Sequence, residues 1–193
     1  DVELIQMPSR GPVVPPLDYI KVSGGIMRDS AVHFFDLTRF IAGADPVEVF
    51  ASGSALADPR IAQYDDVDTS AAILKLPSGA IVQIDSVRRT AYGYDERIEV
   101  MGAAGLIEAG RHVTGTVSRF GPGSVVSDGM PVGWFERVQP TYAATLDTFV
   151  TSLETGMPFV PSLTDGLKAQ AIAEAATRSL LSGRSEPIAY PTP

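Results

Sequence analysis

Residues 68–87, DTSAAILKLPSGAIVQIDSV, carry the strongest indication of how this chain folds. Two apolar segments flank Ser78-Gly79, and a Ser-Gly pair between two such segments is typical of a hairpin turn. Because a hairpin joins antiparallel strands, this stretch predicts two neighbouring strands of an antiparallel sheet.

Further strands are predicted on both sides of this hairpin. Loose alternation of apolar and polar residues predicts a strand at the N-terminus and another just before the hairpin, and a segment rich in Pro and Gly is expected to be a loop. A strand pair is expected around Gly102 and Gly105, followed by two weaker strands. In chain order these segments are DVELIQMPSR (1–10), the loop GPVVPPLDYIKVSGG (11–25), PVEVFASGSAL (46–56), YDERIEVMG (94–102), LIEAG (106–110), HVTGTVSRF (112–120) and GSVVS (123–127).

Three helices are predicted, one before the main run of strands and two after it. Each ends at a Gly, and the last is expected to be capped by Thr164 or Ser162. Strands grouped together with helices kept apart indicate an α+β fold: a large, mostly antiparallel open sheet with helices on one face. The other face then needs solvent or a partner to cover it. The helical segments are IMRDSAVHFFDLTRFIAG (26–43), TYAATLDTFVTSLETG (141–156) and TDGLKAQAIAEAATRSLLSG (164–183).

Composition restricts the classes of function open to this chain. Its 193 residues suit one domain, and 45% hydrophobic with 20% charged residues is ordinary for a globular protein. A net charge of −8 without a basic cluster argues against binding to nucleic acid or to an anionic membrane. The absence of Cys excludes disulfides and thiolate sites and suits the cytoplasm, where we expect the protein. There is no G-x-G-x-x-G motif and no apolar run near the roughly 20 residues of a membrane span.

The helix predicted over 26–42 is apolar around most of its circumference, yet it carries Asp29, His33 and Asp36. In a regular α-helix this i, i+4, i+7 spacing puts the three side chains on one stripe. Because a buried carboxylate is costly without a partner, the stripe is expected to face a polar cavity or a partner. Three interpretations stay open: His33 as a general base beside Asp29, a structural Asp–His pair or solvated edge, and a metal site completed by the distant His112.

Three segments of the chain resemble one known family. VSGGIMRDSAVHFFDLTRFIAG (22–43) resembles the catalytic helix of the glucose–fructose oxidoreductase and inositol dehydrogenase (Gfo/Idh/MocA) family. AYGYDERIEVMGAAGLIEAG (91–110) resembles the sheet segment that follows in inositol 2-dehydrogenases, and PSLTDGLKAQAIAEAATRSLLSG (161–183) resembles their last helix. The segments occur in the family's order with compatible spacings. The resemblance covers essentially the whole chain, as the C-terminal domain of that family.

The resemblance implies a two-domain enzyme, of which residues 1–193 form the C-terminal substrate-binding, catalytic and oligomerisation domain. An N-terminal Rossmann domain, absent from this chain, would bind NAD or NADP and contribute a catalytic Lys. Subunits of the family pair through the open sheet, which implies a homodimer or homotetramer. By position, His33 matches the family's catalytic His and Asp29 the acidic residue one turn before it. The positions matched to substrate binding are Ser30, Tyr94 and Arg10.

Two residues depart from the family's pattern. Phe34 stands where an acidic residue usually follows the catalytic His, and Gly11 stands where Asn or Asp is common. Both departures remove polar groups near the expected pocket, so we describe the substrate as a class rather than as inositol itself.

The sequence therefore predicts an enzyme: an NAD(P)-dependent dehydrogenase, similar to inositol 2-dehydrogenases, that oxidises a secondary hydroxyl of a cyclic polyol or sugar. The chain alone is expected to be inactive. The alternatives are a non-catalytic sugar-binding or oligomerisation module of the same fold and a metal-dependent hydrolase or lyase. We expect no metal, nucleic acid or membrane among its partners.

Overall fold

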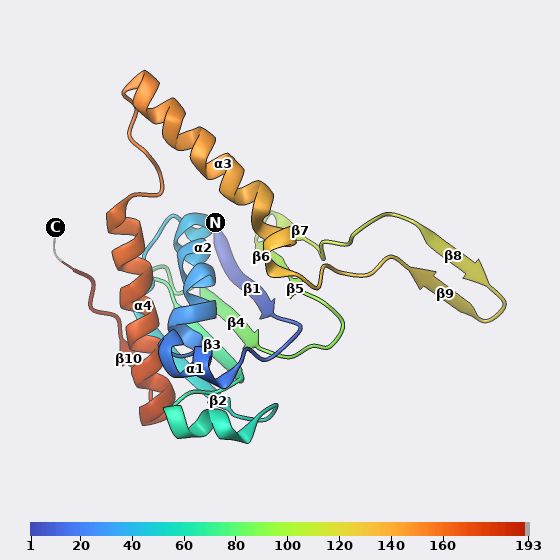
Figure 1. Ribbon diagram of the computed structural model, residues 1–193. Helices are drawn as coiled ribbons and strands as arrows, with labels where there is room; N and C mark the ends of the chain where they lie inside the picture. Colours follow the sequence, from blue (N-terminus) through green and yellow to red (C-terminus); the bar gives the residue numbers. More distant parts are fainter. Residues whose placement is uncertain (192–193) are drawn as a thin grey trace.

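The computed structural model describes residues 1–191 and is built around one large sheet (Figure 1). Within these residues the sheet has eight strands, in the order β10-β2-β3-β4-β1-β6-β7 with β5 paired to β1. β1 and β4 run parallel, and the other pairs described are antiparallel. The strands span Val2–Arg10 (β1), Glu48–Ser54 (β2), Thr69–Lys75 (β3), Ile81–Val87 (β4), Asp95–Glu96 (β5), Ile98–Gly102 (β6), Gly105–Ala109 (β7) and Glu186–Pro187 (β10).

Strands β3 and β4 form the hairpin predicted for residues 68–87, and they pair in register along their whole lengths. Gly79 in the turn has φ 91°, a left-handed backbone conformation that favours glycine. Val82 and Ile84 are buried, whereas Ile81 and the intervening Gln83 are exposed, because alternate side chains of a strand point to opposite faces. The alternation thus gives the sheet one core face and one open face.

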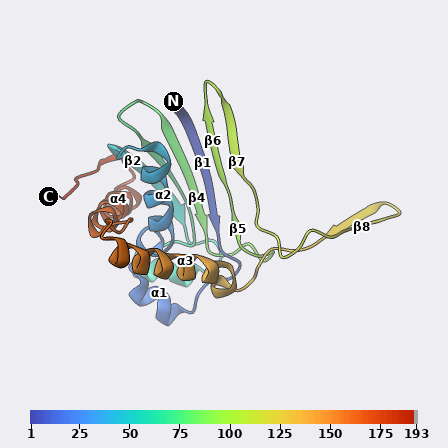
Figure 2. The same cartoon turned by 90° about the horizontal axis from the view of Figure 1, so that it is seen from above.

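Helices cover one face of the sheet and leave the other open (Figure 2). A π-helix, η1, at Met27–Ala31 leads directly into α2 at Val32–Ala42. α4, at Leu163–Ser182, packs against both and against β2. Their buried side chains form one core with the covered side of β1 to β4. The predicted α+β fold, with a mostly antiparallel sheet and helices on one face, is confirmed.

The last helix begins at one of the two caps that the sequence proposed. The Ser162 hydroxyl accepts a hydrogen bond from the N–H of Asp165, and the Asp165 carboxylate accepts one from the N–H of Ser162. This capping box satisfies two backbone groups that a helix start leaves without partners. Small buried residues such as Ala173 and Ala176 then let α4 lie close to its neighbours.

The segment predicted as a loop, residues 11–25, contains a short helix, α1, at Leu17–Ser23, so the prediction was wrong there. The N–H groups of Tyr19 and Ile20 donate to the carbonyl of Pro16. Pro is tolerated at a helix start because the first N–H groups have no helical partner. The Ile20 side chain is 2% exposed, and this tertiary burial stabilises a helix that composition alone did not indicate.

The helix predicted to start at Thr141 begins earlier: α3 spans Trp134–Thr155 and contains Pro140. Pro lacks an N–H, so the carbonyl of Glu136 loses its helical partner. Glu136 is exposed, so solvent is available to that carbonyl and the helix continues through the proline. No residue of α3 is buried by the rest of the described chain.

A hairpin arm extends from the body (Figure 1). β8, at Ser118–Gly121, and β9, at Ser124–Ser127, pair with each other and not with the main sheet. All eight residues of the two strands are exposed.

A 3₁₀ helix, η2, spans Pro59–Tyr64. Among residues 1–191, no helix has both the length and the apolar character that crossing a membrane requires.

Candidate active site

The polar residues of the first long helix lie where its geometry changes. Met27–Ala31 form a π-helix, which places one extra residue in the turn, and only Val32–Ala42 are regular α-helix. π-Turns are rare and occur frequently at functional sites. Asp29 and Ser30 both lie within this turn. The regular 3.6-residue geometry behind the predicted stripe therefore does not hold in this turn, and Asp29 and Asp36 bond different partners, Arg88 and Arg39.

Asp29 is held by two side chains from other elements. The hydroxyl of Tyr19, in α1, donates to Oδ1 of Asp29. Nη1 of Arg88, just after β4, donates to Oδ2 at 2.8 Å. The hydrogen bond to Asp29 raises the pKa of Tyr19, so the hydroxyl stays protonated and able to donate at neutral pH. Both carboxylate oxygens thus have a fixed partner, and the side chain remains 17% exposed.

A second carboxylate lies beneath this pair. Asp66 accepts a hydrogen bond on Oδ1 from the N–H of Ile26 at 2.8 Å, at the point where the helix begins. Its Oδ2 is 3.7 Å from Nη2 of Arg88, and the two side chains are only 3% and 4% exposed. Arg88, Asp66 and Tyr19 are not among the site residues predicted from the sequence. A signal for Arg88 was available, because the alternation of buried Val82 and Ile84 puts this arginine on the core face.

His33, the second residue after the π-turn, is exposed. Within residues 1–191 its imidazole makes no hydrogen bond. The side-chain hydrogen bonds of Asp29 go to Tyr19 and Arg88, not to His33. The structure therefore places Asp29, Ser30 and His33 on neighbouring turns with an accessible imidazole. A ring nitrogen of His33 is free to meet a ligand.

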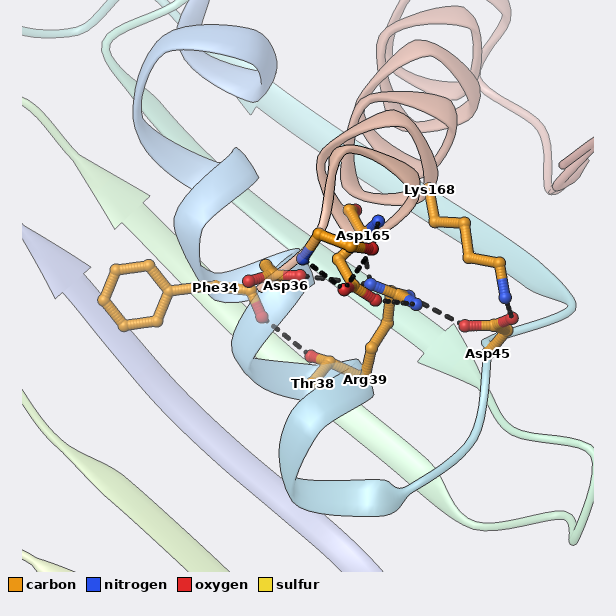
Figure 3. A network of polar contacts seen from close by, with 8 residues as sticks. Phe34, Asp36, Thr38, Arg39, Asp45, Asp165 and Lys168 are labelled. Atoms are coloured by element: carbon orange, nitrogen blue, oxygen red, sulfur yellow. Dashed lines mark hydrogen bonds and ion pairs between the residues drawn. The ribbon is translucent and has the colours of Figure 1, made fainter. Parts of the chain in front are cut away.

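Asp36 takes no part in this group. Nη1 of Arg39 donates to it at 3.1 Å, and the same guanidinium bonds Asp45 at 2.7 Å and Asp165 at 3.1 Å. Figure 3 shows this network joining α2 to the start of α4, with Lys168 also on Asp45. Asp36 is therefore a structural residue. Within the described residues no three His, Asp or Glu side chains are placed to hold one metal ion, so the ligands required by the metal alternative do not converge.

Tyr94 lies beside the same helix, across a hollow of about 190 Å³. Arg137 of α3 stacks its guanidinium 5.1 Å from the centre of the Tyr94 ring and pairs with Glu96. Burial raises the pKa of Tyr94, and burial also raises the pKa of Glu96 against the opposing effect of Arg137. The residues around this hollow are Phe34, Leu37, Tyr94, Glu96, Arg97, Ile98, Ala109, Gly110, His112 and Arg137.

The two departures from the family's pattern both flank Tyr94. Phe34 lines the same hollow and is 5% exposed, so its ring belongs to the core. A Cβ added to Gly11 would lie 3.7 Å from Cε1 of Tyr94, which is an ordinary contact distance. An acidic residue at position 34 would point into the core side of this hollow. On the α2 side, Phe34 and Leu37 therefore give this hollow an apolar wall.

Arg10 is not brought together with His33. It lies at the end of β1 and bonds Asp85 of β4 through Nε and Nη2. These two residues alternate with the buried Met7 and Ile84, so they project from the open face of the sheet, opposite to the helices. They line a wider hollow of about 620 Å³ on that face.

The described geometry fits a known family. The sequence profile of the GFO/IDH/MocA C-terminal domain matches residues 5–108, which include Asp29, His33, Arg88 and Tyr94. The chain belongs to the GFO/IDH/MocA family. The resemblance seen in the sequence is thereby confirmed.

Several relatives of this GFO/IDH/MocA domain are dehydrogenases of inositols. It is 38% identical over 189 residues to the inositol 2-dehydrogenase of Rhizobium meliloti (strain 1021), covering 98% of this chain and 57% of that protein. It is 41% identical over 182 residues to the myo-inositol 2-dehydrogenase of Thermotoga maritima, covering 94% and 54%. The scyllo-inositol 2-dehydrogenase (NAD(+)) of Bacillus subtilis (strain 168) is 30% identical over 173 residues, covering 88% and 49%.

A solved structure agrees with the fold as well as the sequence. The myo-inositol dehydrogenase of Corynebacterium glutamicum ATCC 13032 matches with a TM-score of 0.92 at 33% identity, covering 100% of this chain and 57% of that one. The GFO/IDH/MocA domain described here spans little more than half the length of these relatives.

Proposed function

We propose that this chain is the substrate-binding and catalytic half of an NAD(P)-dependent dehydrogenase that oxidises a secondary hydroxyl of a cyclic polyol or sugar. One observation carries the proposal: an accessible imidazole, His33, follows a π-turn whose carboxylate, Asp29, is held at both oxygens. The relatives' names supply the substrate class and the cofactor.

In this proposal His33 is the general base. Its neutral imidazole accepts the proton of the reacting hydroxyl, and such a positioned base accelerates a reaction by about 10²–10⁴-fold. Asp29 accepts a hydrogen bond from a neighbouring hydroxyl, Ser30 offers a second polar contact, and Tyr94 forms part of the wall. When bound, the nicotinamide would accept the hydride from the carbon that carries the reacting hydroxyl. Arg10 is left out, because it lies on the other face of the sheet.

The dinucleotide is not expected to bind to this chain. Among residues 1–191, the Gly24-Gly25 turn is the one glycine pair that opens a helix, and a phosphate would need its free N–H groups. The carboxylate of Asp66 already fills that position: it bonds the N–H of Ile26, and a Cβ on Gly25 would lie 3.2 Å from it. We therefore assign NAD or NADP to a Rossmann domain in the remaining part of the protein.

The exposed apolar face of α3 supports the proposal that another part of the protein packs against this helix. A helix with no buried apolar face is marginal in water, because most helical stability in proteins comes from burial of such a face. α3 carries a run of exposed apolar side chains at helical spacing: Tyr142, Leu146, Phe149, Val150 and Leu153. The relatives contain further chain equal to more than two fifths of their length, and we propose that this part covers α3.

The test is an assay of the intact protein with myo-inositol, scyllo-inositol and cyclic sugars, following reduction of NAD⁺ and NADP⁺ by absorbance. We expect turnover with at least one cyclic polyol. In parallel, calorimetric titration of residues 1–193 with either dinucleotide should show no specific heat. If no polyol or sugar is turned over, this proposal is wrong, and the non-catalytic sugar-binding or oligomerisation module replaces it. Micromolar binding of a dinucleotide to the 193-residue chain would contradict the assignment of the cofactor site.

A second proposal concerns the open face of the sheet, which we assign to another copy of this chain. The seven strands along the sheet hold 42 residues. At about 3.3 Å per residue and about 4.8 Å between strands they give a face of about 650 Å², so a two-fold pair would bury roughly 1,300 Å² in all. Stable interfaces bury about 1,200–2,000 Å². The apolar side chains exposed on this face are Phe50, Ile73, Ile81, Met101 and Leu106.

We expect Ile73→Lys, in the inner strand β3, to shift the chain from a dimer or tetramer to a monomer in sedimentation at micromolar concentration. A charge in the centre of an interface is costly to bury without a partner. Val22→Lys, at an apolar residue on α1 that is exposed like Ile73 but lies away from the sheet face, is the control and should leave the assembly unchanged. A wild-type chain that stays monomeric throughout this range would refute the proposed pairing.

A further inference from the structure

The least expected charged residue in the molecule is Arg88. Its side chain is 4% exposed, and one of its nitrogens, Nη1, bonds Asp29 at 2.8 Å. Nε and Nη2 have no hydrogen-bond partner within the described residues, and neither has Oδ2 of Asp66, 3.7 Å from Nη2. A buried donor without a partner costs free energy, so this arrangement is poor as a purely stabilising ion pair.

The position of Arg88 explains what the arrangement achieves. The backbone N–H of Arg88 donates to the carbonyl of Asp68 at 2.8 Å, which anchors the residue to the rigid end of the hairpin. From there the guanidinium reaches across to the π-turn. It meets Asp29 on one side and, on the other, Asp66, the residue that bonds the helix start at Ile26. Arg88 therefore ties the orientation of one exposed carboxylate to the sheet.

The carboxylate of Asp29 cannot rotate while both anchors hold. Tyr19 occupies Oδ1 and Arg88 occupies Oδ2. Each carboxylate oxygen has about two lone pairs, so each can still accept one further hydrogen bond from the solvent side. A ligand hydroxyl would meet an acceptor of fixed direction near the His33 helix.

We infer that Arg88 is a positioning residue, which acts on the reaction only by fixing the carboxylate of Asp29 relative to His33. The inference rests on the proposed function. Geometry of this kind matters because a displacement of about 1 Å from the productive arrangement can cost on the order of 10²-fold in rate. The side chain itself does not touch substrate.

The test compares variants of the intact enzyme with its cyclic polyol substrate. Arg88→Met, which removes the charge and all donors, should lower kcat by about 10- to 10²-fold and raise KM by no more than about threefold. Arg88→Lys keeps a charged donor on the same stem and should recover a large part of the lost kcat. Equal kcat for Met and Lys would show that the contact with Asp29 is not what matters.

Arg28→Met is the matched control. Arg28 lies in the same π-turn and forms a two-point pair with Glu174 of α4, with both distances 2.7 Å. It therefore ties the turn to the body as Arg88 does, without contacting Asp29. We expect a fall in thermal stability and a kcat within about threefold of wild type. A loss of kcat equal to that of Arg88→Met would assign both arginines a structural role only.

A double-mutant cycle gives the decisive comparison. If Arg88 acts only through Asp29, Arg88→Met in an Asp29→Asn background should cost less than about a further twofold in kcat. A full additional loss there would overturn the inference. If Arg88→Met does not fold, Tyr19→Phe replaces it in the cycle. Tyr19 is 47% exposed and holds the other oxygen of Asp29, so its variant should fold and should lose kcat in the same direction, by a smaller factor.

The two proposals fail in different ways. An active wild type whose Arg88→Met variant keeps its kcat overturns the positioning role and leaves the proposed function intact. A wild type inactive on every cyclic polyol overturns the proposed function, and the role of Arg88 with it.

Discussion

Replacement of His33 by Ala in the intact enzyme should lower kcat by about 10²–10⁴-fold while KM changes far less. A general base acts in the transition state, so its removal reduces the rate of the chemical step rather than the binding of substrate. The loss should be largest near neutral pH for oxidation of the alcohol. It should shrink at high pH, where hydroxide and the acidity of the substrate compensate for the missing base.

Asp36→Asn provides the control for this experiment. Asp36 is a carboxylate one turn further along the same helix, but it bonds Arg39 and lies in the network that joins α2 to α4. We expect its loss to lower stability slightly and to leave kcat within about threefold of wild type. A well-folded His33→Ala variant with wild-type kcat would remove His33 from the role of base, and the mechanism would fail with it.

Replacement of Phe35 by Ala should destabilise the chain by about 3–5 kcal/mol. Phe35 is 0% exposed and lies at the centre of the core between α2 and the sheet. Its removal leaves a cavity that the surrounding helices and strands cannot fill. Since domains are stable by only about 5–15 kcal/mol, such a loss is a large part of the total.

Phe40→Ala tests whether position rather than residue type causes this effect. Phe40 is in the same helix and is 82% exposed, so its truncation should change the free energy of unfolding by no more than about 0.5 kcal/mol. Urea unfolding of both variants at one protomer concentration measures the difference, because self-association makes apparent stability depend on concentration. Similar midpoints for the two variants would contradict the placement of Phe35 in the core.

Features that depend on neighbours in the chain could be predicted from the sequence. The hairpin over residues 68–87 follows from alternation and a Gly in the turn, both of which act within a few residues. The cap of α4 is equally local, because Ser162 and Asp165 satisfy each other's backbone groups. The family resemblance identified the segment that carries Asp29 and His33, which periodicity alone left among three interpretations.

Other features were decided by contacts between distant segments. The helix α1 in the Pro-rich segment depends on burial of Ile20, and the sequence around it reads as a loop. The pairing of β1 with β4, its only parallel neighbour among the described strands, joins residues about 77 positions apart. This pairing brings Arg10 to Asp85 on the open face of the sheet, opposite to the helix that carries His33.

By itself, the sequence determined the strands of the main hairpin and the presence of the three longer helices, since these rest on short-range patterns. The family resemblance, also read from the sequence, pointed to Asp29 and His33. Only the tertiary structure decided what each charge does. Asp29 lies in the π-turn, and Arg39 draws Asp36 into the contact with α4. Arg88 comes to Asp29 from 59 residues away. The reason is physical: burying a charge is favourable only with a partner, and the partners here are brought together by the fold rather than by the order of the chain.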